Sequence, residues 1–302
     1  MPYAKVIVNP VAGSGKTARN WPEVMAALRH TALEFDYEIT AAPGQATEIA
    51  KTAARQGYAL VVSVGGDGTV NEVANGLFQA GCLDQVALGI VSMGTGGDYI
   101  RTIGIPRDFR LACKCFVSPR RVTVDLGIVE FTNGGRVMSR IFLNSAGVGL
   151  DAELTRATGR RMKHLGTKLS YLSGLLGTLF SYHNRDLWLT IDGEKEPRKV
   201  CTVLMSNGKY GGGGMLAAPD ADPGDGFFDV MVVGDMSKLD LLRTLPRVYR
   251  GTHLSHPKVT IKRAREVEIH PIQPVAVQAD GELLGEAPAG FKIMHRALQV
   301  VV

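Results

Sequence analysis

The segment 61–72 has the sequence VVSVGGDGTVNE, and it decides the fold of the first part of the chain. Its apolar start, 61–64, predicts a buried strand, and its end predicts the beginning of a helix. The three glycines between them let backbone N–H groups approach phosphate groups, which the positive end of the helix also attracts. Asp67 lies among these glycines, where a carboxylate can hold Mg²⁺ together with phosphate oxygens.

A second glycine-rich turn, MGTGGDYIR at 93–101, follows the next apolar run. It supplies a hydroxyl from Thr95, a carboxylate from Asp98 and a guanidinium from Arg101, which can neutralise phosphate charge through two parallel hydrogen bonds. Open α/β sheets bind their ligands where successive strands end. The two turns therefore predict one phosphate-binding site.

The opening loop, NPVAGSGKT at 9–17, is similar to a P-loop but is not one. The P-loop pattern needs Gly five positions before the Gly of Gly-Lys-Thr, and Pro10 stands there. The loop can still offer backbone N–H groups to a phosphate. The alternative is a plain strand-to-helix turn.

The surrounding pattern predicts the architecture. Strand-like and helical segments alternate over the first ~125 residues, which predicts parallel strands joined by crossover helices. From Val122 on, short β-like runs predict a mostly antiparallel β domain with helices near 165–182 and 237–250. A chain of 302 residues fits two domains. We place them at 1–124 and 125–294.

Composition excludes several classes of protein. Hydrophobic residues make up 45%, and the 36 glycines lie in no low-complexity tract, so the chain is neither disordered nor collagen-like. The four cysteines show no CxxC pairing, which favours reduced thiols over a zinc site or a disulfide framework. A formal net charge of +5 favours anionic partners. No apolar run indicates a signal peptide or a membrane span, and we expect a cytoplasmic protein.

Taken in order, these segments resemble the lipid-kinase superfamily of diacylglycerol, sphingosine and ceramide kinases, and in particular its bacterial soluble diacylglycerol-kinase branch. Gly-Gly-Asp-Gly-Thr alone is shared with NAD kinases, so the ordered set carries the specificity. The resemblance covers essentially the whole chain, and its matching segments are Asn9-Pro10, 65–69, 94–98, 124–127, 144–151, 211–229 and 280–282.

The resemblance implies an α/β protein: a Rossmann-like nucleotide domain of the NAD-kinase and diacylglycerol-kinase type, a C-terminal β-sandwich-like domain, and ATP and Mg²⁺ in the cleft between them. The last strand, 295–302, is expected to return to the first domain. A structural Mg²⁺ is implied at the 222–227 turn, with Asp225 as side-chain ligand and backbone carbonyls from Asp222 and Phe227. The candidate nucleotide-binding residues are Asn9, Pro10, Val11, Ala12, Gly13, Thr40, Gly65, Gly66, Gly68, Thr69, Asn71, Glu72, Thr95, Asp98 and Arg101.

Phosphoryl transfer needs a group that accepts the proton of the attacking hydroxyl. The family's catalytic Asp maps onto Asp280 in the turn Asp280-Gly281-Glu282, although Asp-Gly is by itself a hairpin signal. Asp67 competes for the role of base. We favour Asp280 as the base and Asp67 as the organiser of Mg²⁺ and phosphate, and we include Glu282 among the candidate catalytic residues.

One position departs from the family, since Gly97 stands where the second turn usually carries Asn. The loss of that amide removes donors near the nucleotide.

The predicted function is an ATP- and Mg²⁺-dependent kinase of a neutral lipid hydroxyl, with diacylglycerol as the favoured acceptor and phosphatidic acid as product. The alternatives are a kinase of a long-chain base or another hydroxylated lipid, and a catalytically weak lipid-binding protein on the same fold.

The remaining expectations concern partners. Leucines recur between Leu165 and Leu179 beside a basic stretch, 156–168, which suits either an anionic membrane surface or a core helix with a solvated start. We expect peripheral association with the inner face of the membrane, no nucleic-acid binding, and compatibility with a homodimer. The glycines at 211–214 are expected to shape the mouth of the cleft, and His253 is expected at the surface.

Overall fold

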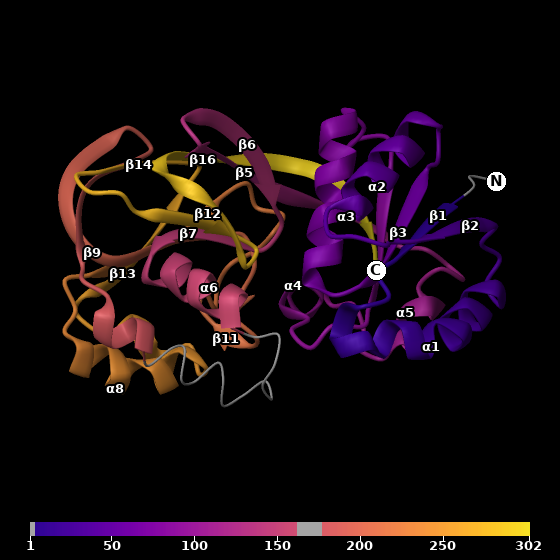
Figure 1. Ribbon diagram of the computed structural model, residues 1–302, viewed down its shortest axis with the longest axis horizontal. Helices are drawn as coiled ribbons and strands as arrows, with labels where there is room; N and C mark the ends of the chain where they lie inside the picture. The colour runs from indigo at the N-terminus through magenta and orange to yellow at the C-terminus, as the bar shows by residue number, and fades with distance from the viewer. Residues whose placement is uncertain (1–3, 162–176) are drawn as a thin grey trace.

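The computed structural model describes residues 4–161 and 177–302, and its N-terminal half is a parallel sheet between two helical layers (Figure 1). The strands run in the order β2-β1-β3-β4, as the alternating pattern predicts. The elements of this half are β1 (Ala4–Val8), α1 (Ala12–Arg29), β2 (Phe35–Ile39), α2 (Gln45–Arg55), β3 (Leu60–Gly65), α3 (Asp67–Ala80), β4 (Ala87–Ser92), α4 (Asp98–Ile103) and α5 (Phe109–Lys114).

Helices cover both faces of this sheet, because the buried strands β3 and β4 present apolar side chains to either side. Helices α2 and α3 pack on one face through side chains such as Ile49 and Leu77. Helices α1 and α5 pack on the other through Trp21 and Phe109. The carboxyl ends of the strands are left open for the loops that carry the candidate site.

The second half is a mostly antiparallel β structure around its own apolar core, which confirms the fold class. In the part of the chain that the structure describes, every strand pair formed wholly within this half is antiparallel. Its elements are β5 (Arg121–Asn133), β6 (Arg136–Phe142), β7 (Ser145–Gly149), α6 (Leu150–Arg161), β8 (Arg185–Ile191), β9 (Glu194–Ser206), β10 (Tyr210–Gly211), β11 (Met215–Leu216), β12 (Phe228–Gly234), α8 (Lys238–Val248), η1 (Thr252–Ser255), β13 (Val259–Ala264), β14 (Glu266–Pro271), β15 (Ala276–Ala279) and β16 (Glu282–Val301).

Two long strands connect the halves. β5 and β16 pair antiparallel over most of their length, and the end of β16 also pairs parallel with β4, where Val300 lies opposite Leu88 (Figure 1). All strands except the short β10–β11 pair therefore belong to one continuous sheet. The candidate cleft lies between two halves that share backbone hydrogen bonds.

The helices of the second half differ in part from expectation. The helix expected near 237–250 is α8, whereas α6 was not expected. The leucine pattern from Leu165 to Leu176, and most of the basic stretch beside it, lie outside the described residues. His253 is buried rather than at the surface. Its Nε2 lies 3.1 Å from the carbonyl oxygen of Ala217, which provides a hydrogen-bond partner for this buried nitrogen. The four cysteines are free thiols. Among the described residues, no helix is both long and apolar enough to cross a membrane.

Candidate active site

The two glycine-rich turns lie in direct backbone contact. A Cβ added to Gly94 would lie 2.7 Å from the Cα of Gly66, so only glycine allows this approach. Across the contact, Asp67 Oδ2 accepts a hydrogen bond from the backbone N–H of Gly97 at 2.8 Å. The structure therefore brings the two predicted turns together at one place.

The opening loop lies beside the first turn. Asn9 Nδ2 donates to Thr69 Oγ1 at 3.0 Å, which ties the end of β1 to the start of α3. Residues 13–15 have left-handed φ values, so regular helical geometry in α1 begins only after them. Asn9, Gly13 and Thr69 thus surround the carboxyl ends of β1 and β3, a position from which backbone N–H groups can bind phosphate.

A cavity of about 210 Å³ opens between the turns and the second half. Three carboxylates line it, and glycines of the 211–214 segment line its other side, as expected of residues that shape the cleft. Polar groups of the segment before β7 complete the wall. The lining residues used below are Asp67, Asp98, Asn144, Ser145, Gly211, Gly212, Gly213, Asp280 and Gly281.

Asp280 anchors several segments at this cavity. Its Oδ2 accepts hydrogen bonds from Asn71 Nδ2 at 2.7 Å and from the N–H of Leu143 at 2.8 Å. Its Oδ1 accepts from the N–H groups of Asn144 at 2.9 Å and Ser145 at 3.0 Å. A carboxylate offers about four lone-pair sites, so all of them are in use. Burial raises the pKa of Asp280, and these four donors oppose that rise.

Arg140, which the sequence analysis did not single out, links Glu282 to Asn71, and Asn71 in turn bonds to Asp280. Arg140 on β6 forms an ion pair with Glu282 Oε2 at 2.7 Å and donates to Asn71 Oδ1 at 2.9 Å. The other carboxylate oxygen of Glu282 lies toward the first turn, 3.9 Å from where a Cβ of Gly68 would be. Burial raises the pKa of Glu282, and the neighbouring Arg140 opposes the rise.

Asp98 carries an unpaired carboxylate oxygen at the cavity. Its Oδ2 accepts from the N–H of Gly213 at 2.7 Å, while its Oδ1 is buried without a hydrogen-bond partner in the described chain. Burial raises the pKa of Asp98, and the nearby charge of Asp67 raises it further. A buried carboxylate oxygen without a partner, next to a second carboxylate, is suited to bind a cation.

The side chains of two further candidate nucleotide residues, Asn71 and Glu72, bond within the protein. Glu72 accepts from the N–H groups of Gly44 at 3.1 Å and Ala46 at 3.2 Å, and so caps the beginning of α2. Asn71 is buried, and its amide bonds to Asp280 and Arg140. Both side chains are therefore engaged within the protein and do not face a nucleotide as free groups.

The 222–227 turn does not present a free cation site. Asp225 accepts the N–H of Phe227 at 3.0 Å, and its other oxygen contacts the guanidinium of Arg263. Asp222 accepts the N–H of Gly224 within the turn. The Asp225 carboxylate is therefore engaged within the protein, and the structural Mg²⁺ with backbone carbonyls of Asp222 and Phe227 stays a prediction.

Gly97, the departure from the family pattern, adjoins an arginine. Arg107 Nη2 donates to the carbonyl oxygens of Thr95 at 2.5 Å and Gly96 at 3.2 Å. A Cβ on Gly97 would lie 3.6 Å from Arg107 Nε and 3.4 Å from Ile100. The guanidinium therefore braces the turn at the place where an asparagine side chain would begin.

We expect Gly97→Asn to be tolerated and to strengthen nucleotide binding. Asn adopts left-handed φ values readily, and the φ of Gly97 is +67°. One added hydrogen bond to a nucleotide would lower the ATP Kd about fivefold, as titration calorimetry would measure. Gly104→Asn is the matched control, since its φ is +80° and nothing lies within 4 Å of its Cβ position. Equal ATP affinities in both variants and the wild type would contradict this expectation.

Sequence reasoning left four residues at or near the site without a role: Arg140, Asn144, Ser145 and Asp151. The last three lie in a segment that the family resemblance includes, so their positions carried a signal. Arg140 lies on β6, a strand whose first half is exposed and which also carries Arg136, and no local sequence pattern sets Arg140 apart.

Comparison with known families places the chain. The model of the diacylglycerol kinase catalytic domain matches residues 3–129, and that of the YegS C-terminal NAD kinase beta sandwich-like domain matches residues 144–302. The chain belongs to the diacylglycerol kinase family. It is thus a lipid kinase, and membership of a kinase family implies ATP as the phosphate donor.

Individual relatives cover the whole length of this family member. Diacylglycerol kinase of Bacillus subtilis (strain 168) is 28% identical over 302 residues, covering 100% of this chain and 97% of the relative. Diacylglycerol kinase of Staphylococcus carnosus is 28% identical over 297 residues, covering 98% and 94%. A crystal structure of a putative diacylglycerol kinase from Bacillus anthracis str. Sterne has the same fold, with a TM-score of 0.78 at 24% identity over 99% of this chain and 96% of that one.

Proposed function

We propose that this kinase transfers the γ-phosphoryl group of ATP, in a Mg²⁺-dependent reaction, to the hydroxyl of a neutral lipid, with diacylglycerol as acceptor and phosphatidic acid as product. The observation that carries the proposal is a pair of joined cavities. The carboxylate-lined cavity between the turns shares Ser145, Gly211, Gly212 and Gly281 with a second cavity of about 250 Å³. One ligand group can therefore reach the carboxylates while the rest lies in the second cavity.

The second cavity suits the acyl-bearing part of an acceptor. Its wall between α6 and β11 is apolar, and it includes Leu154, Leu204, Met215 and Ala217. Such a wall takes hydrocarbon out of water, which a wholly polar acceptor cannot exploit.

Asp151 bears on the choice between neutral and amine-bearing acceptors. It lines the second cavity, and its carboxylate accepts hydrogen bonds from Thr202 Oγ1 at 2.8 Å and Gln278 Nε2 at 2.9 Å. Burial raises the pKa of Asp151, and the hydrogen bonds from Gln278 and Thr202 oppose the rise. Each carboxylate oxygen already has a donor within the protein, so less of this carboxylate is left to pair with the ammonium of a long-chain base.

The cavity residues fit Mg²⁺. Asp67 and the unpaired Oδ1 of Asp98 supply two carboxylates, and Mg²⁺ prefers few carboxylates plus phosphate oxygens. Asp67 and Asp98 would hold the ion, which when bound neutralises charge on the phosphate groups.

The reaction needs a base near the acceptor hydroxyl. The hydroxyl oxygen forms a bond to the γ-phosphorus, the bond from that phosphorus to the β–γ bridging oxygen breaks, ADP leaves, and the hydroxyl proton passes to a carboxylate. The sequence favours Asp280 for this role. Because four N–H donors occupy Asp280, we propose that Glu282, on the same turn, accepts the proton while Asp280 positions the cavity wall.

Asp67→Asn is expected to weaken nucleotide binding only where Mg²⁺ contributes. The ATP Kd in saturating Mg²⁺ should rise about tenfold, because the amide gives up the charge that attracts the ion. In EDTA the variant and the wild type should bind ATP alike. Calorimetric titration under both conditions measures this, with the exposed Asp84→Asn as control. A Kd that is unchanged in Mg²⁺ would remove Asp67 from the ion site.

The proposed function is tested by incubating the purified protein with γ-labelled ATP and a panel of diacylglycerol, a long-chain base, ceramide and NAD, followed by separation of the products. Label in phosphatidic acid supports it. Label only in the phosphorylated long-chain base would show that the acceptor is a long-chain base and not diacylglycerol. Binding of diacylglycerol without label transfer would indicate a lipid-binding protein on the kinase fold.

We place the reaction at the cytoplasmic face of the membrane, because ATP and the lipids of the inner leaflet are both present at that face.

A further inference from the structure

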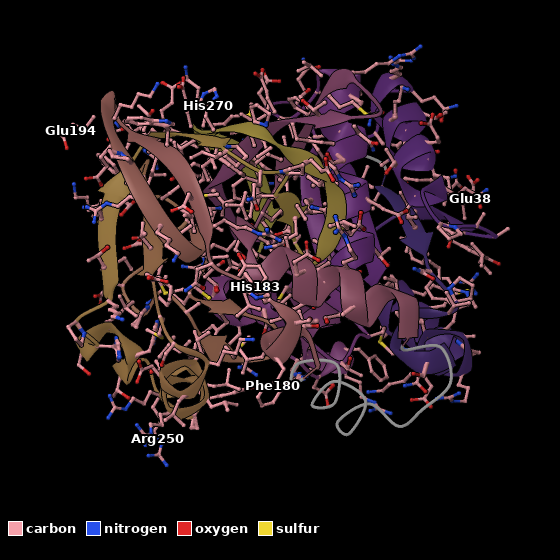
Figure 2. The ribbon with its side chains drawn as sticks, turned by 60° about the vertical axis from the view of Figure 1, so that its left-hand side comes forward. Glu38, Phe180, His183, Glu194, Arg250 and His270 are labelled. Carbon is pink, nitrogen blue, oxygen red and sulfur yellow. The ribbon has the colours of Figure 1, made fainter. Side chains whose placement is uncertain are left out.

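The edge of the C-terminal half that carries α8 exposes large apolar side chains. Phe180, Leu239 and Tyr249 are 60%, 55% and 50% exposed. The side chain of Lys238 contacts the backbone carbonyl of Phe180, which places Phe180 beside the start of α8. Figure 2 shows Phe180 and Arg250 along the lower edge of the molecule, with Glu194 and His270 at the opposite edge.

The same edge concentrates positive charge. Residues 237–258 contain five Lys and Arg against Asp240 alone, a formal charge of +5 − 1 = +4, whereas the whole chain carries +5. Asp235, just before this segment, already forms an ion pair with Lys199 at 3.5 Å. The segment 237–258 is therefore a strongly basic stretch of the chain, as is 156–168.

Helix α8 directs its two sides differently. Leu241 and Leu242 pack inward, and Thr244 is buried. On the other side, Leu239, Arg243 and Arg247 recur every four residues and are exposed, and Arg250 follows just after the helix. We call the following six exposed side chains the α8 face: Phe180, Leu239, Arg243, Arg247, Tyr249 and Arg250.

The inner side of α8 and the second cavity share one apolar cluster. Leu241 and Leu242 belong to this cluster together with Leu154 and Leu204, and the last two line the second cavity. One apolar cluster therefore connects the packing of α8 with the packing of the cavity wall.

We propose that the α8 face docks on the surface of a bilayer that contains anionic phospholipids. Arginines among exposed Phe, Leu and Tyr combine attraction to anionic headgroups with side chains that insert at the level of the headgroups. The face lacks the acidic residues that would repel such a surface, apart from Asp240 near Ser237. The proposal shares the lipid acceptor with the proposed function, but its test requires no catalysis.

Vesicle sedimentation tests the proposal with phosphatidylcholine vesicles prepared with and without phosphatidylglycerol. The wild type should bind only the anionic vesicles, and added salt should weaken binding. The variant R243Q/R247Q/R250Q should bind them at least ~50-fold more weakly, since each basic residue contributes about fivefold. Phe180→Ser with Leu239→Ser should also weaken binding, about tenfold or more.

A matched control uses exposed apolar residues outside the α8 face. Val137 and Ile272 are 78% and 72% exposed, on β6 and just after β14. V137S/I272S should bind vesicles as the wild type does. Equal losses in the control and in the α8-face variants, binding that ignores phosphatidylglycerol, or unchanged binding by the arginine variant would each overturn the proposal.

Activity on a dispersed acceptor separates this proposal from the proposed function. With short-chain diacylglycerol below its aggregation limit, the α8-face variants should turn over as the wild type does, and with acceptor in anionic vesicles they should be slower. A wild type that transfers no phosphate but binds anionic vesicles through the α8 face would contradict the proposed function alone. A wild type that is active on dispersed acceptor, together with α8-face variants that are as active as the wild type on vesicles, would contradict the docking proposal alone.

Discussion

Asp280→Asn should lower the free energy of unfolding by about 2 kcal/mol and reduce phosphoryl transfer at least ~10³-fold. Four N–H donors meet on this carboxylate, and an amide has one oxygen, so about two donors lose their acceptor. The φ of Asp280 is +47°, a value that Asn tolerates, so backbone strain does not add to the loss. Chemical denaturation and a kinase assay on the same preparation measure both effects.

The exposed Asp186→Asn provides the control and should change neither quantity. Calorimetry should show ATP binding to Asp280→Asn within about threefold of the wild type, because the glycine turns are intact. Lost activity with undiminished stability would return Asp280 to the role of proton acceptor. Full activity in the variant would remove it from the reaction.

Glu282→Gln should lower kcat by about 10²–10⁴-fold while the free energy of unfolding changes by less than about 1 kcal/mol. The amide cannot accept the hydroxyl proton, whereas the partly exposed ion pair with Arg140 contributes little to stability. The control is Glu286→Gln, an exposed glutamate on the same strand. Single-turnover kinetics with saturating ATP separate the chemical step from product release.

The pH profile adds a second readout for Glu282. Burial raises the pKa of its carboxyl, so the proton-accepting form is lost at a higher pH than for an ordinary glutamate. The acidic limb of kcat in the wild type should therefore lie above the ordinary value of about 4.3, with activity falling as pH falls through it. The residual activity of Glu282→Gln should lack this limb. A variant that keeps both the rate and the limb would place the base elsewhere.

Local pattern predicted the glycine turns and the alternation of strands and helices, because both depend on neighbouring residues. The segment 61–72 forms β3, the turn and the start of α3 as expected. Two successive turns at the ends of parallel strands then meet by the geometry of the sheet alone.

Contacts between distant segments could not be predicted in the same way. Asp280 bonds to the N–H groups of 143–145, more than 130 residues away, and no local pattern reports which backbone donors a turn will meet. Glu72 follows the glycine turn in sequence, yet it caps α2 rather than facing the cavity. The guanidinium of Arg263 reaches Asp225 only because β13 lies beside β12.

The pairing of the last strand has a consequence for how the protein is made. Val300 and its neighbours complete the sheet of the N-terminal half against β4 and against Val122 and Val124 of β5, although the whole second half of the chain separates them from β4 in sequence. The nucleotide half therefore cannot acquire all of its hydrogen bonds until that second half has been synthesised. Until β16 arrives, the edge of β4 is an unpaired strand edge that is open to aggregation.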